Sequence, residues 1–272
     1  VSLNMKDKLV YDITDKENSL ETLVRLTNFR KEYWEHCILE TKMLSGDVWK
    51  SFQRIVDQFN IQPTFEIRDL ICHLQHFTTS ADGCKHIKSK GITDLRTTYE
   101  DVESELRRFL DEQGIKIDIS NARLYFNNHD IGSIEYSYNN FSHDYDSKIH
   151  KLWSVGRKFY YDFCVCGFFS FDHKRPYGGN VHERPEILFN ISEAIGKRID
   201  DIWKDTHECY VVKFATPYTN ICRDEIIDEK TDLLYKAFHN ATYDTDEDDA
   251  LLKDGISILP ENIISIERFE FE

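Results

Sequence analysis

Hydrophobic residues recur at helical spacing through the first sixty positions of the chain. One loose stripe comprises Leu23, Leu26, Trp34, Cys37 and Ile38. A second stripe, at spacings of 3, 4 and 3, comprises Trp49, Phe52, Val56 and Phe59. Asp47 precedes this second stripe and can cap a helix by accepting a backbone N–H hydrogen bond. The pattern predicts a helical region over residues 1–63, closed by Pro63 and packed on the main fold.

From Thr64 onward the pattern predicts strands mixed with helices. The segment FEIRDLICHLQHFTTS reads as a strand, and Ser80 is expected to cap a short helix that ends near Gly91. A longer helix is expected from Thr97 to Gly114, and another over 144–160. Further strands are predicted in IKIDI, ARLYF, SIEYSY, FYYDFCVCGFFSF, ECYVVKFAT and IISIERFEF, with a turn at NNHDIG and an acidic helical stretch before the last strand. Because strands and helices do not alternate regularly, we expect an α+β core over residues 64–272.

The composition limits the kind of partner. The chain has 272 residues and a formal charge of −15, which works against a general grip on nucleic-acid phosphates but leaves room for a local basic cleft. Seven irregularly spaced cysteines favour a reduced, cytoplasmic protein. No apolar run approaches the roughly 18 residues of a membrane helix. A small ligand or a basic protein partner is the easier expectation.

The first candidate for chemistry is the stretch LQHFTTSADGCKHIKSKGI. Side chains two positions apart on a strand share one face, so His76 and Thr78 are expected to point the same way. An imidazole beside a hydroxyl can hold a ribose diol or an amide through paired donors and acceptors. The same spacing also fits a histidine that is simply hydrogen-bonded at a strand end.

This H-x-T strand, followed by a short helix and a Gly-Ile turn, resembles the start of ADP-ribosyltransferase folds. It is similar to the DNA-targeting ADP-ribosyltransferase toxins and to the tRNA 2′-phosphotransferases. The resemblance covers about twenty residues and implies a split-sheet core with NAD as substrate. It further implies that His76 binds the NAD ribose, that Thr78 supports the nicotinamide side, and that the protein is a toxin or defence effector modifying a macromolecule, either a protein or a nucleic acid.

These families also use an aromatic residue and a glutamate on neighbouring strands, and the segment RPYGGNVHERPEIL offers both. Tyr177 and Glu186 are the best placements for these catalytic roles, and Glu267 in SIERFEF is a competing carboxylate. Arg184 and Glu186 are expected on one face of a strand. There Arg184 can pair with a pyrophosphate, and the carboxylate can stabilise an oxocarbenium-like ribose. A surface ion pair between them is the alternative interpretation.

Metal sites are not expected from the sequence. The cysteines and histidines at 72–86, 164 and 166 lack the Cys-x2–4-Cys spacing of zinc knuckles. DTDEDDALLKDG lacks the glycine and glutamate that a calcium loop requires. The His-Asp pairs in NNHDIG and FSHDYD, which leave a nuclease or phosphodiesterase open, do not commit to a metal. The acidic segment 243–249 supports another alternative, a non-catalytic inhibitor or interaction protein that binds a protein partner.

Overall fold

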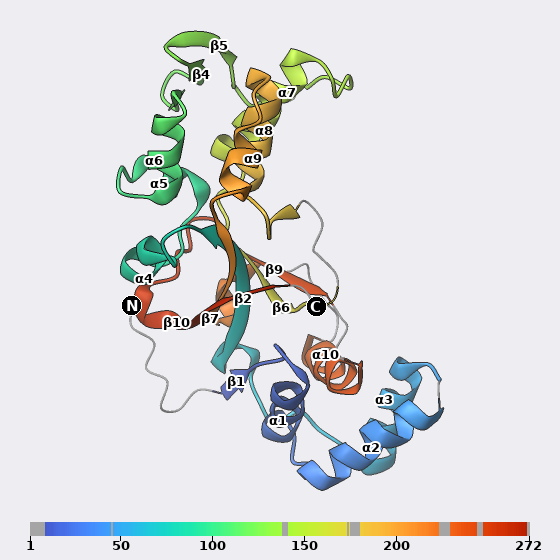
Figure 1. Cartoon of the computed structure of the whole chain (residues 1–272). Coiled ribbons are helices and arrows are strands. Elements are labelled where there is room, and N and C mark those ends of the chain that lie inside the picture. Colours follow the sequence, from blue (N-terminus) through green and yellow to red (C-terminus); the bar gives the residue numbers. More distant parts are fainter. Residues whose placement is uncertain are drawn as a thin grey trace.

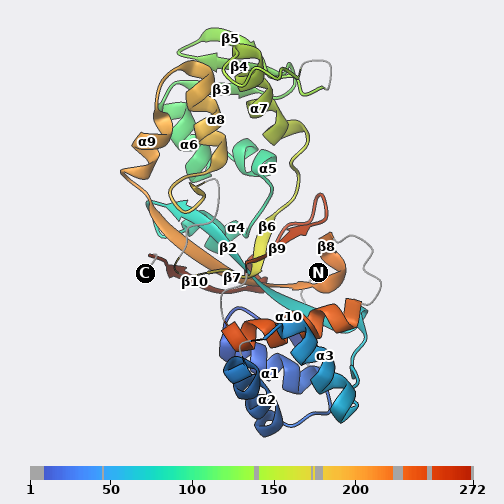
Figure 2. The same ribbon diagram turned by 90° about the vertical axis from the view of Figure 1, so that its right-hand side faces the viewer.

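The protein is an α+β molecule in which a central sheet lies between two helical lobes (Figures 1 and 2). The computed structural model describes residues 9–44, 46–137, 141–172, 174, 180–222, 229–243 and 247–270. The predicted fold class is therefore confirmed at the level of an α+β architecture with N-terminal helices. Within the described residues, no helix is long and apolar enough to cross a membrane.

Among the described residues, the central sheet has seven strands and is antiparallel except for one parallel pair, β1 with β2. Its strands are β1 (Leu9–Tyr11), β2 (Leu70–Ser80), β6 (Cys166–Ser170), β7 (Glu208–Pro217), β8 (Ile221–Cys222), β9 (Asp248–Leu252) and β10 (Ile263–Arg268). Strand β2 is central because β7 pairs with it from Ile71 to Ser80, while β1 and β6 share its other edge. The predicted strands at ECYVVKFAT and IISIERFEF are confirmed as β7 and β10.

The lower helical lobe packs beneath the sheet. It consists of α1 (Lys16–Leu26), α2 (Lys31–Leu44), α3 (Val48–Phe59) and α10 (Glu229–Tyr243). The Asp47 side chain accepts a hydrogen bond from the Lys50 amide at 3.2 Å, so the predicted cap of α3 is confirmed. Trp34 and Phe238 share one hydrophobic core with Phe214 of the sheet. The described part of region 1–63 thus has no core of its own.

The upper lobe contains a second hydrophobic core, formed by residues between Tyr99 and Trp203. Its elements are α5 (Leu95–Glu100), α6 (Glu105–Glu112), β3 (Ile115–Asp118), β4 (Arg123–Phe126), β5 (His129–Ser133), α7 (Lys148–Tyr160), α8 (Glu186–Ile195) and α9 (Ile199–Lys204). The short helix α4 (Lys85–Lys90) lies between this lobe and the sheet (Figure 1). Three 3-10 helices complete the described elements: Ile67–Asp69, Tyr218–Asn220 and Pro260–Asn262.

Several predicted boundaries in and around the upper lobe are wrong. The helix expected from Thr97 to Gly114 is two helices, because Ser104 starts α6 by accepting a hydrogen bond from the Arg107 amide. Val102 lies in the break between the two helices and is 67% exposed. The NNHDIG turn is confined to Asn127 and Asn128, both at positive φ, as a type I′ hairpin turn requires. Strand β5 therefore begins at His129 and ends before most of SIEYSY.

Two other segments differ from their predicted conformation. Arg184 and Glu186 do not enter a strand, because Glu186 begins α8, whose buried residues Ile187, Leu188 and Ile191 recur at helical spacing. The acidic stretch at 243–249 does not form one helix. Helix α10 ends at Tyr243, and Asp248 and Asp249 belong to β9, although residues 244–246 lie outside the described part of the chain.

A pocket at the end of strand β2

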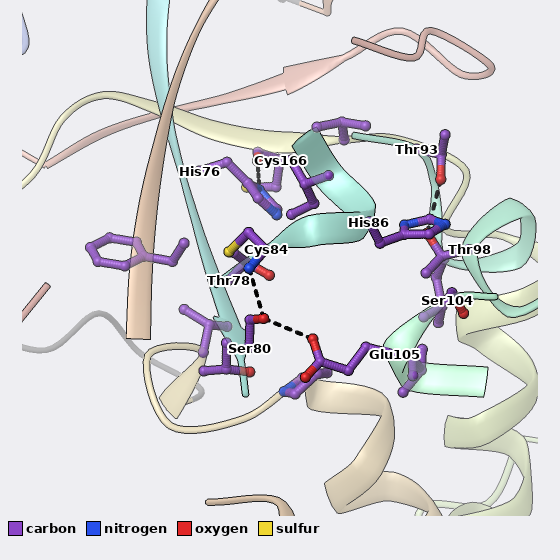
Figure 3. Close-up of a pocket in the computed structure, with 18 of the residues that line it drawn as sticks. His76, Thr78, Ser80, Cys84, His86, Thr93, Thr98, Ser104, Glu105 and Cys166 are labelled. Carbon is purple, nitrogen blue, oxygen red and sulfur yellow. Dashed lines mark hydrogen bonds between the residues drawn. The ribbon is translucent and has the colours of Figure 1, made fainter. Parts of the chain in front are cut away.

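A pocket of about 310 Å³ lies where the last half of β2 meets the upper lobe (Figure 3). Its walls come from β2, from α4 to α6, from the chain entering β6 and from Trp203 of α9, whose indole N–H donates to Thr79 of β2 at 2.8 Å. The volume falls within the range of small-molecule sites. Elements far apart in the sequence therefore meet at the strand end that carries the H-x-T motif.

His76 is fixed on the pocket wall by one hydrogen bond. Its Nδ1 lies 2.7 Å from the backbone carbonyl oxygen of Cys166. A carbonyl can only accept, so Nδ1 carries the hydrogen and, in the neutral ring, Nε2 is the acceptor. Burial lowers the pKa of His76, although the Cys166 carbonyl opposes this shift. The ring is therefore neutral at pH 7, and no described residue occupies its Nε2 acceptor.

Hydroxyl groups form much of the remaining polar lining. Thr78 lies two residues after His76 on β2, and Thr93 and Thr98 hydrogen-bond to each other at 2.9 Å (Figure 3). The Ser80 hydroxyl accepts a hydrogen bond from the Cys84 amide at 2.9 Å, which ties the end of β2 to the start of α4. Ser80 was predicted to cap this helix. Instead Cys84 occupies the N-cap position, at a φ of 61°.

Glu105, at the start of α6, supplies a carboxylate to the pocket. Ser80 donates to it at 2.8 Å, and the Ala81 amide donates at 2.6 Å. His207, whose ring stacks on Trp203 at 3.5 Å between centroids, lies 3.3 Å from the same carboxylate. Burial alone would raise the pKa of Glu105, but these hydrogen bonds outweigh it and hold the pKa below its usual value. The pocket therefore holds an ionised carboxylate.

Three thiols also line the pocket, and all three are poor nucleophiles. Burial raises the pKa of Cys84 and Cys164 to about 11 and that of Cys166 to about 12. The thiol, not the reactive thiolate, dominates at neutral pH. No lysine or arginine of the described residues lines the pocket. Its polar groups are therefore the imidazoles of His76 and His86, hydroxyls, thiols and the carboxylates of Glu105 and Asp162.

The structure brings together only part of the predicted site. His76 and Thr78 both line the pocket. Arg184 does not, because it pairs with the fully buried Asp200 at 3.2 Å and lies over the Phe189 ring at 4.7 Å. Glu186 is also outside the pocket lining and pairs with Lys158 at 2.7 Å. The predicted residue Tyr177 lies outside the described residues.

The competing carboxylate, Glu267, is exposed on β10. It pairs with Val211 in the sheet register, whereas His76 pairs with Val212, so the two side chains lie on opposite faces. Among the described residues there is no group of three or more His, Cys, Asp or Glu side chains that could hold a metal ion.

Two residues near the pocket have no functional signal in the sequence. Tyr210 pairs with Thr78 in the sheet and therefore shares its face, but nothing in ECYVVKFAT marks this tyrosine. Glu105 follows a helix-capping serine, a pattern that predicts only a helix start. Both residues become candidates only through the tertiary contacts.

Comparison with known proteins does not assign the chain to a family. No protein-family model matches the chain, and no curated protein or solved structure matches it either.

Proposed function

We propose that the pocket binds the nicotinamide riboside half of NAD and that the protein is an ADP-ribosyltransferase acting on a macromolecular target. On this proposal the sheet is the core of an ADP-ribosyltransferase-like split-sheet fold. The observation that carries the proposal is the His76 ring, whose Nδ1 is fixed by the Cys166 carbonyl and whose Nε2 is left to accept from a ligand. A ribose hydroxyl is a suitable donor, and Thr78 on the same strand face can contact the neighbouring nicotinamide amide.

The reaction would use the pocket's negative charge. The bond between nicotinamide and ribose breaks, and its electron pair stays on the nicotinamide nitrogen, which becomes neutral. Positive charge then develops on the ribose, and an ionised carboxylate stabilises it. A nucleophile of the target forms the new bond to the ribose carbon and loses its proton. Two carboxylates line the pocket, and Asp162 is already paired with the Lys158 ammonium at 2.7 Å. We therefore assign this electrostatic role to Glu105, which is ionised.

NAD binding by the wild-type protein and by the His76→Ala variant tests the proposal. We expect NAD at a hundredfold excess over its dissociation constant to stabilise the wild type by about 2.7 kcal/mol. The variant is expected to lose at least about tenfold in affinity, because about 1.4 kcal/mol of hydrogen bonding to a buried ring disappears. Calorimetry and thermal unfolding measure both effects.

His129→Ala is the matched control for this experiment, since His129 is an exposed histidine on β5, away from the pocket. It should bind NAD like the wild type. No NAD binding by the wild-type protein would contradict the proposal, and the acidic interaction protein would then be the better hypothesis.

A second variant separates binding from transfer. Glu105→Gln keeps the side-chain size but removes the charge, so we expect NAD binding to persist while the rate of nicotinamide release falls by about a hundredfold. Glu267→Gln, on the opposite sheet face, should leave the rate unchanged. If Glu186→Gln abolishes the reaction and Glu105→Gln does not, the carboxylate predicted from the sequence is the relevant one.

A further inference from the structure

The segment 83–92, GCKHIKSKGI, is a local concentration of positive charge in a strongly acidic chain. It contains Lys85, Lys88 and Lys90 and no acidic residue, whereas the whole chain carries a formal charge of −15. All three lysines are on α4 and exposed. Neither hydrogen bonds nor ion pairs to other described residues engage their ammonium groups. These charges therefore need a different structural or functional explanation from the many paired lysines of this protein.

Helix α4 places these charges at the pocket. Cys84 and Ile87 line the pocket, and Lys88 follows Ile87 directly. A Cβ atom placed on Gly83 would lie 4.0 Å from Lys88 Nζ and 4.0 Å from the Tyr210 hydroxyl. The Lys88 side chain therefore turns back along α4 toward the strand pair that carries Thr78 and Tyr210. Its charge also acts on the Cys84 thiol, where it opposes the larger effect of burial on the pKa.

The backbone that carries these lysines is held at both ends. At the start of α4, the Cys84 amide donates to Ser80 at 2.9 Å. Past its end, Ile92 and Ile258 exchange two backbone hydrogen bonds of 2.9 and 2.8 Å. Only the side chains of the lysines must be ordered when a ligand binds, which keeps the entropic cost of binding low.

The acidic groups nearest to this segment are already engaged, and one of them, Asp101, pairs with His86 of the segment at 3.0 Å. Asp82 lies 3.8 Å from Arg108 and accepts a hydrogen bond from the Lys85 amide. Glu208, which accepts from the Tyr210 hydroxyl at 3.3 Å, pairs with Arg268 at 2.9 Å. The lysine charges are therefore not cancelled by a neighbouring free carboxylate among the described residues.

The pocket itself offers no described cation to a phosphate, and Arg184 is held by Asp200. If the nicotinamide riboside half of a dinucleotide lies in the pocket, its diphosphate lies at the pocket edge, where α4 carries the lysines. We infer that Lys88, with Lys85 one turn before it on the same helix face, binds the diphosphate of the dinucleotide in the pocket. This inference rests on the proposed NAD function.

Calorimetry with two ligands tests this inference. NAD carries the diphosphate, whereas nicotinamide riboside presents only the half that enters the pocket. For the double variant Lys85→Glu with Lys88→Glu, we expect the NAD affinity to fall at least tenfold and the nicotinamide riboside affinity to stay unchanged. The NAD affinity of the wild type should fall with rising salt, and the double variant should lose most of this dependence.

Lys90→Glu is the matched control, because it introduces the same charge change on the same helix but on a different face from Lys85 and Lys88. It should keep the wild-type NAD affinity. If the wild type binds NAD and the double variant binds it equally well, the lysine inference is overturned and the NAD proposal stands. An equal loss for both ligands also overturns it, since the lysines would then act on the pocket shape. If the wild type binds neither ligand, both proposals fall.

Discussion

Replacing Gly91 by alanine is expected to destabilise the protein by roughly 2–6 kcal/mol, from backbone strain and steric overlap together. Gly91 has a φ of 87° and a ψ of −164°, a region of backbone space that only glycine occupies readily. In addition, a Cβ atom there would lie 1.9 Å from the carbonyl oxygen of Ile258 and 3.0 Å from its carbonyl carbon. Since these atoms are backbone atoms held by hydrogen bonds to Ile92, they cannot move aside cheaply.

Urea-induced unfolding of the two proteins measures this loss. Gly255→Ala is the control, because Gly255 also has a positive φ of 74° but has no atom within 4 Å of an added Cβ. It should cost only about 1–2 kcal/mol, the strain without the overlap. Equal losses in the two variants would show that the contact with Ile258 contributes nothing. Because α4 forms a pocket wall, the Gly91 variant is also expected to bind NAD more weakly.

Replacing Asp200 by alanine is the second large effect, with an expected loss of about 3–5 kcal/mol. Asp200 is fully buried at the start of α9 and pairs with Arg184 at 3.2 Å and with Arg198 at 3.0 Å. Its removal leaves Arg184, whose side chain is only 11% exposed, as a buried charge without this partner. Arg198→Ala should cost much less, since the Arg198 side chain is 58% exposed and Arg184 still neutralises Asp200.

The ion pairs of Asp200 also make the free energy of unfolding depend on pH, and the sign of this dependence follows from the pKa of Asp200. Burial alone would raise this pKa, but the hydrogen bonds from Arg198 and Ser192 and the charges of Arg198 and Arg184 lower it below the usual 3.8. A carboxyl group with a lowered folded pKa stabilises the fold above its unfolded pKa and loses that contribution as the pH falls through the folded pKa. The free energy of unfolding should therefore fall more steeply below about pH 4 in the wild type than in Asp200→Asn. Parallel curves would contradict the assignment.

Sequence patterns predicted the elements whose signals are local. The Asp47 cap, helix α3 and the strands β7 and β10 depend on residues within one element, and all are confirmed. The stripe that located α3 is only partly buried, since Trp49 and Phe59 at its ends are exposed. The pattern failed where a cap competed with a hydrophobic stripe. Ser104 divides the helix expected over 97–114, and a periodicity argument does not register a serine in the middle of a stripe. Strand β1, with three residues, carries too little pattern to be identified.

In the candidate site, too, the residues fixed by a local pattern were predicted and those fixed by tertiary contacts were not. His76 and Thr78 share a pocket because alternation along one strand is a local property. The placement of Arg184 and Glu186 in the site depended on a strand that the structure does not contain. Arg184 instead pairs with Asp200, which the packing of α8 on α9 brings close to it. Glu105 reaches the pocket from a separate lobe. Its contact with Ser80 joins residues 25 positions apart, which no local pattern encodes.

The pairing of β2 with β7 has a consequence for the order in which the protein folds. Almost half of the chain separates these two strands, and the upper lobe with its own core is contained in that interval. During synthesis from the N-terminus, the residues of that core emerge before β7 does. Contacts between distant segments also form more slowly than local ones. We therefore expect the upper lobe to acquire structure first, while the edge of β2 that pairs with β7 still lacks its partner. In that interval the nascent chain presents one unpaired edge of its central strand, and this is the stage at which it is most prone to aggregate.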